Sequence, residues 1–107
     1  MVIGVSPTEI LTSVADSLVA QQKYASLEDA LRGIALAAVR DKTAYYRRRI
    51  RGFERKYGSS FDSFTARLKN RATPAEEDDW LAWRSAQRML VDWKQSYKAL
   101  RNDRARR

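Results

Sequence analysis

The apolar residues of this chain recur every three or four positions over most of its length, which is the spacing of amphipathic helices. The first such stripe follows the segment VSPTEI, in which Ser6 is a predicted N-cap, Pro7 takes the first helical position and Glu9 completes a capping box. A first helix is therefore predicted over residues 7–21. Its apolar face comprises Ile10, Leu11, Val14, Leu18 and Val19.

A longer stripe begins after Ser26, a predicted N-cap with Asp29 three positions on, and continues until Gly58 supplies a left-handed stop. No proline interrupts it, so the pattern predicts one helix of about 30 residues, roughly 45 Å long. Gly33 and Gly52 each weaken this helix by about 1 kcal/mol relative to alanine, and a break at either glycine is the alternative. The stripe comprises Leu27, Leu31, Ile34, Ala35, Ala38, Val39, Tyr46, Ile50, Phe53 and Tyr57.

The second half of the chain predicts a short helix and another long one. The short helix covers residues 60–70 and buries Phe61, Phe64 and Leu68. The long helix begins in TPAEEDDW, where Thr73 is the N-cap, Pro74 takes the first position and Glu76 completes a capping box. It is expected to run to about Leu100, after which the tail RNDRARR frays. Its stripe comprises Trp83, Ala86, Leu90, Trp93, Tyr97 and Leu100, widened by Trp80 and Met89.

The first six residues admit a second interpretation, since Val2, Ile3 and Val5 favour extended structure. A lone strand has to pair, and pairing with a second copy would make the protein a dimer. The predicted fold class is therefore mainly α, with about four helices, two of them long. The N-terminal strand, paired across a dimer, is an alternative for the first six residues. At 107 residues we expect a single domain, in which residues 1–57 form the dimerisation half and residues 58–107 a helical partner-binding half with a basic tail.

Composition removes several kinds of chemistry. The chain has no cysteine and no histidine, which excludes a disulfide framework, a Cys/His zinc site, a thiol nucleophile and a Ser-His-Asp triad. The run EEDD at residues 76–79 points in four directions on a helix, so it complements the helix dipole and does not converge on a metal ion. We expect no enzyme, no metal site and no cofactor. With no signal-peptide pattern and no membrane-length apolar run, a cytoplasmic protein is expected.

The net charge of +8 is concentrated in two blocks: residues 40–57 hold eight basic and two acidic groups, and residues 80–107 hold the same numbers. In the first block only Glu54 offsets a run of six cations, whereas a merely solvated helix usually mixes signs. This run is the candidate site for a nucleic acid or an acidic partner, with a solvated face as the alternative. It consists of Arg47, Arg48, Arg49, Arg51, Arg55 and Lys56.

Three tryptophans on one predicted helix are unusual for a chain of this length. Their regular spacing favours a role in the core, while tryptophan also dominates the energetic hot spots of protein interfaces. Both roles stay open from the sequence. The candidate partner interface comprises Trp80, Trp83, Trp93 and Tyr97.

Residues 1 to about 40 combine a predicted strand, a turn and a helix start. The residues are Val2, Ile3 and Val5 for the strand, Tyr24 and Ser26 for the turn, and Glu28, Asp29, Ala30, Leu31 and Arg32 for the helix start. In this arrangement the segment resembles the ribbon-helix-helix antitoxins of bacterial toxin–antitoxin pairs. The segments FERKYGSSFDSFTARL and EEDDWLAWRSAQ look like the helical tails of small antitoxin-like proteins. The resemblance implies a C-terminal segment that wraps and blocks a toxin. In family members that read DNA the strand carries polar or basic side chains, whereas MVIGV has none, so phosphate contacts from elsewhere would carry any DNA affinity.

These observations lead to an expected function and two alternatives. The expectation is an antitoxin-like regulatory protein, a homodimer or hetero-oligomer that neutralises a toxin and touches DNA through its basic helix. The first alternative is a helical nucleic-acid-binding or ribonucleoprotein-assembly subunit without catalytic activity. A membrane-surface protein is the third interpretation, because aromatic residues accompany the basic helix. Packing explains that aromatic stripe better, so no membrane partner is expected.

Overall fold

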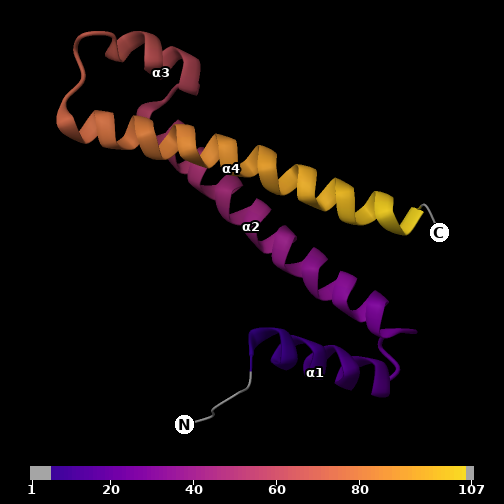
Figure 1. Ribbon diagram of the computed structural model, residues 1–107. Helices are drawn as coiled ribbons and strands as arrows, with labels where there is room; N and C mark the ends of the chain where they lie inside the picture. Colours follow the sequence, from indigo (N-terminus) through magenta and orange to yellow (C-terminus); the bar gives the residue numbers. More distant parts are fainter. Residues whose placement is uncertain (1–5, 106–107) are drawn as a thin grey trace. The chain divides into compact units, whose positions relative to one another are not determined.

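The computed structural model describes the backbone of residues 6–105 and the side chains of residues 6–102. Four helices follow one another: α1 (Pro7–Ala20), α2 (Leu27–Tyr57), α3 (Phe61–Leu68) and α4 (Pro74–Ala105) (Figure 1). The described residues contain no strand, so the predicted mainly α class with two long helices is confirmed. The predicted N-terminal strand falls on residues 1–5, which lie outside the described part of the chain.

Reciprocal capping boxes begin α1 and α4, as the sequence predicts. At α1, the Glu9 amide donates to Ser6 Oγ over 3.1 Å and the Ser6 amide donates back to the Glu9 carboxylate over 3.4 Å. At α4, the Glu76 amide donates to Thr73 Oγ1 over 3.2 Å and the Thr73 amide donates to Glu76 Oε1 over 2.9 Å. Each box satisfies two amides that a helix start otherwise leaves without an acceptor.

Helix α2 runs without a break from Leu27 to Tyr57, through both Gly33 and Gly52. Its first turn is capped by Ser26, whose hydroxyl accepts a 3.1 Å hydrogen bond from the Asp29 amide. Its end coincides with Gly58, which has a φ of +60°, a left-handed conformation that glycine adopts without steric cost. The alternative of a helix broken at a glycine is therefore wrong.

Helix α4 continues past its predicted end at about Leu100 and reaches Ala105. The tail contains neither glycine nor proline to stop the helix, and cations such as Arg101 are favourable near a helix C-terminus. Helix α3 is shorter than predicted and ends at Leu68, shortly before Asn70 turns to a φ of +63°. The absence of a stop signal after Leu100 and the turn at Asn70 therefore explain the two differences.

The chain divides into two compact units, residues 1–38 and residues 39–107, and α2 contributes to both. Among the described residues of the first unit, Ala15 and Ala30 are fully buried. The predicted apolar face of α1 is wrong in part, because Ile10 and Val14 expose 54% and 48% of their surface. The fully buried positions of this unit therefore carry small side chains, and larger apolar residues of α1 stay exposed.

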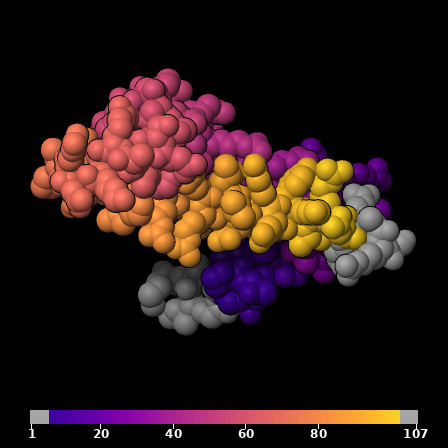
Figure 2. Space-filling model, turned by 90° about the horizontal axis from the view of Figure 1, so that it is seen from above, coloured from indigo at the N-terminus to yellow at the C-terminus, as the bar shows by residue number. Residues whose placement is uncertain are grey.

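The second unit packs around an aromatic cluster. Trp83 and Phe64, each 1% exposed, are its largest buried side chains. The Trp83 ring stacks on Phe53, Tyr57 and Phe64 at centroid distances of 5.6, 6.3 and 5.4 Å, and Phe61 meets it edge-on at 5.4 Å. Figure 2 shows α3 lying against the first turns of α4, and α3 contributes Phe61 and Phe64 to the cluster.

Helix α4 returns antiparallel to the second half of α2 (Figure 1). Lys56 near the end of α2 meets Asp79 in the second turn of α4, and Arg40 further back on α2 meets Tyr97 near the end of α4. These two contacts fix the register between the helices. The register brings residues of the two basic blocks together, since Arg40 of the first block meets Tyr97 of the second.

Candidate nucleic-acid interface

Four arginines of α2 form one exposed surface in the second unit. Arg47, Arg48, Arg51 and Arg55 lie within about a third of a turn when residues are placed 100° apart around the helix axis. All four are exposed, and they lie beside and opposite the stripe that packs on α4. Among the described residues, none of the four has a carboxylate within ion-pair distance. We name this surface, Arg47, Arg48, Arg51 and Arg55, the arginine arc.

The other two cations of the predicted site lie on the far side of α2. Arg49 places its guanidinium 5.5 Å from the Phe53 ring centre and 5.9 Å from the Tyr45 ring centre. Lys56 Nζ lies 2.6 Å from Asp79 Oδ2. The structure therefore divides the predicted six residues into an arc of four and two cations that have partners within the protein. The sequence alone could have predicted this separation for Arg49, because helical residues are spaced 100° apart and Arg49 lies about half a turn from the arc.

The charge of Lys56 is neutralised by an ion pair with Asp79 inside the protein. Asp79 accepts hydrogen bonds from the Lys56 ammonium and the Tyr57 hydroxyl, and these bonds lower the pKa of the Asp79 carboxyl, the Lys56 bond most. The same carboxylate raises the pKa of Lys56 and of Tyr57. Because Asp79 neutralises Lys56, this lysine adds little to an external positive field.

The basic surface extends across to α4 through a groove that the sequence analysis missed. Arg40 and Arg47 line it from α2, and Lys94 and Tyr97 line it from α4. Arg40 donates a 3.4 Å hydrogen bond to the Tyr97 hydroxyl, and this bond lowers the pKa of Tyr97. The only signal in the sequence was the presence of two basic blocks on two long helices. Their antiparallel register was needed to join them.

The predicted partner-interface residues occupy different environments. Trp83 lies in the aromatic core, where its side chain has no surface left for a partner. Trp93 and Tyr97 are half-buried, and the Trp93 indole N–H is buried without an acceptor among the described residues. Trp80 is half-buried between α3 and α4, where its Nε1 donates to Thr65 Oγ1 over 2.9 Å.

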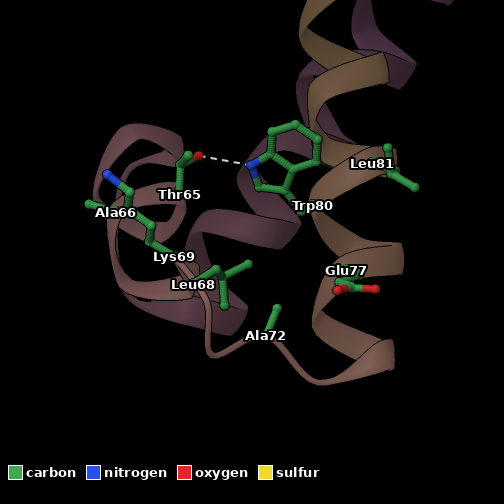
Figure 3. Close-up of a pocket in the computed structure, with 8 residues that line it drawn as sticks. All are labelled: Thr65, Ala66, Leu68, Lys69, Ala72, Glu77, Trp80 and Leu81. Atoms are coloured by element: carbon green, nitrogen blue, oxygen red, sulfur yellow. Dashed lines mark hydrogen bonds between the residues drawn. The ribbon is translucent and has the colours of Figure 1, made fainter.

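Trp80 also forms one wall of a mainly apolar hollow between α3 and α4. Figure 3 shows the indole above Leu68 and Ala72, with the hydrogen bond to Thr65 holding the ring in place. Leu81, on the next position of α4, exposes 56% of its surface. The lining residues are Thr65, Ala66, Leu68, Lys69, Ala72, Glu77, Trp80 and Leu81.

Other kinds of site have no counterpart in the described residues. No three of their acidic side chains come together as ligands for a metal ion, the EEDD run of α4 included. None of the described helices is both long enough and apolar enough to pass through a bilayer. Comparison with family models, curated proteins and solved structures finds no match to this chain.

Proposed function

We propose that this protein is a noncatalytic nucleic-acid-binding protein whose arginine arc contacts the phosphate backbone. The observation that carries the proposal is the arc itself, four exposed arginines on one side of a helix, none of which has a carboxylate within ion-pair distance among the described residues. The pairs Arg47 with Arg51 and Arg51 with Arg55 are four residues apart. Like charges at that spacing destabilise a helix, so an anionic partner would relieve a repulsion that the free protein carries.

The geometry suits a regularly charged polymer. Residues four apart on a helix advance by about 6 Å along its axis, so Arg47, Arg51 and Arg55 follow one another along the helix, with Arg48 beside them. Each cation that neutralises a phosphate releases condensed counterions, which supplies affinity without sequence information. Arginine adds a planar, multiply donating guanidinium that matches the phosphate oxygens. The expected result is binding that depends strongly on salt and weakly on sequence.

A pair of single charge reversals on one helix tests the proposal. We expect Arg51→Glu, in the arc, to weaken binding to a short DNA duplex and to a single-stranded RNA by about tenfold or more. Arg49→Glu makes the same charge change on the opposite side of α2 and should weaken binding far less. Fluorescence anisotropy with labelled oligonucleotides measures both, and circular dichroism checks that each variant keeps its helicity. Equal losses in the two variants would mean that net charge matters and the arc does not.

Neutralisation of a protein toxin is the second candidate, and the hollow beside Trp80 supports it. A half-exposed indole next to exposed Leu81 offers the apolar anchor point typical of protein interfaces. Purifying the tagged protein from its native host with and without nuclease separates the two candidates. A stoichiometric small protein that survives nuclease favours the toxin, and material that disappears with nuclease favours nucleic acid.

A further inference from the structure

The groove between α2 and α4 gathers positive charge from two helices at one place. Arg40 and Arg47 come from α2, seven residues apart and therefore on the same side of that helix. Lys94 comes from α4, together with the Tyr97 hydroxyl. A fourth cation is near, since the Arg101 guanidinium lies 5.7 Å from the centre of the Tyr97 ring. All of these groups belong to the second compact unit.

Among the residues whose side chains the structure describes, no carboxylate lines this groove. Its remaining lining residues are Ala44 and Thr43, and the Thr43 hydroxyl donates to the Val39 carbonyl within its own helix. Asp41 and Asp92, the acidic residues nearest in sequence to the lining cations, are not among the residues that form it. Cations that face one another across two packed helices repel, so an anion lying between them would relieve this repulsion.

We propose that this groove binds a phosphate group. The inference rests on the proposed function in one respect, namely that the phosphate belongs to a nucleic acid. The Arg40 guanidinium and the Lys94 ammonium supply charged donors from opposite walls, and the Tyr97 hydroxyl adds a neutral donor. The small side chain of Ala44 leaves room for the phosphate oxygens.

The lowered pKa of the Tyr97 hydroxyl agrees with a positive potential in the groove. The hydrogen bond from Arg40 lowers the pKa of the Tyr97 hydroxyl, and the charges of Arg40 and Arg101 act in the same direction. A site that favours the negative form of a tyrosine favours other oxyanions for the same electrostatic reason.

Inorganic phosphate tests the groove without any nucleic acid. At equal ionic strength, saturating phosphate should raise the melting temperature of the protein above its value in chloride by about 4 °C or more. Phosphate also stabilises proteins generally by exclusion from their surface, so the variant Lys94→Gln with Tyr97→Phe is the comparison. It should lose most of the shift, whereas Arg88→Gln, an exposed position of α4 outside the groove, should keep it. Equal shifts in the wild type and in Lys94→Gln/Tyr97→Phe would overturn the site.

Oligonucleotides then distinguish the two possible sources of the phosphate. Matched single strands with a 5′-phosphate or a 5′-hydroxyl are titrated against the wild type and against Lys94→Gln/Tyr97→Phe. A several-fold preference for the phosphorylated strand that the variant loses assigns a terminal phosphate; equal binding that the variant weakens for both strands assigns an internal phosphodiester. A phosphate shift without oligonucleotide binding keeps the groove and refutes the proposed function. Oligonucleotide binding that the variant leaves unchanged keeps the function and refutes the groove.

Discussion

Trp83 is the central side chain of the aromatic cluster in the second unit. Four aromatic rings surround it, and 1% of its surface is exposed. We expect Trp83→Ala to lower the free energy of unfolding by about 3 to 5 kcal/mol, because it opens a cavity that these rings cannot fill. Urea denaturation followed by circular dichroism measures the change. A variant that unfolds like the wild type would contradict the core assignment.

Trp83→Phe provides a milder companion to that truncation. The Trp83 indole N–H is buried without an acceptor among the described residues, and an unsatisfied buried donor costs about 1 to 3 kcal/mol. Phenylalanine keeps most of the ring and removes the donor. Its cost should therefore fall well below that of Trp83→Ala, which separates loss of packing volume from loss of the polar group.

Asp79 makes the stability of the protein sensitive to acid. Hydrogen bonds from Lys56 and Tyr57 hold the pKa of Asp79 below its unfolded value, so this contribution is fully present above that value and is lost as pH falls through the folded pKa. We expect Asp79→Asn to be less stable at neutral pH and to lose less stability as the pH falls below about 4, the ordinary pKa of an aspartate. Asp78→Asn, at the exposed neighbouring position, is the control. A wild-type acid profile in Asp79→Asn would show that the contact does not contribute.

At the level of elements, the two glycines inside α2 differ in what surrounds them. A Cβ built at Gly52 meets nothing within 4 Å, whereas one at Gly33 would overlap the Tyr24 ring, whose Cζ would be 2.5 Å away. Gly52→Ala should therefore stabilise the protein by about 1 kcal/mol through helix propensity, and Gly33→Ala should destabilise it. Thermal and urea unfolding of the two variants measure this contrast.

Removing the obstructing ring checks the cause assigned to the Gly33 effect. In a Tyr24→Ala background, Gly33→Ala should lose most of its cost, because the added methyl then has space. An unchanged cost in that background would place the cause in the helix backbone. The sequence gives both glycines the same penalty, since helix propensity contains no information about a neighbouring tyrosine.

The elements that the sequence predicts well are those whose signals are local. The capping boxes of Ser6 and Thr73 and the stop at Gly58 depend on residues within one turn, and all three appear where expected. The packing face of α1 was harder, because spacing alone does not show that Ala15 is buried while Ile10 stays exposed. Which side of an amphipathic helix packs depends on its neighbour, which sequence periodicity does not specify.

For the molecule as a whole, salt is the variable that should control the proposed activity. If the four arginines of the arc each neutralise one phosphate, the logarithm of the association constant should fall against the logarithm of salt concentration with a slope of about −4 on duplex DNA. Each arc arginine changed to glutamine should reduce that slope by about 1. Anisotropy titrations over a series of salt concentrations give the slope. A slope near zero would mean that phosphate contacts do not drive binding.

Counting charges along the sequence predicts one part of the candidate site and misses another. The basic run of residues 47–56 predicted a cationic surface on α2, and helix geometry separates Arg49 from the arc without a structure. The groove at Arg40 and Lys94 needed the register of two helices whose residues are more than 50 positions apart in the chain. That register rests on aromatic packing and on the contacts of Lys56 with Asp79 and of Arg40 with Tyr97, and counting charges along the chain does not predict these pairings.

The aromatic cluster also gives the protein its own optical signal. An indole enclosed by apolar rings emits at shorter wavelength than one in water, so Trp83 should contribute blue-shifted fluorescence and a strong near-ultraviolet dichroism from its fixed neighbours. Trp80 and Trp93 lie in less enclosed places and should report separately. Unfolding of the second unit and occupation of the hollow beside Trp80 are therefore observable in the unlabelled protein.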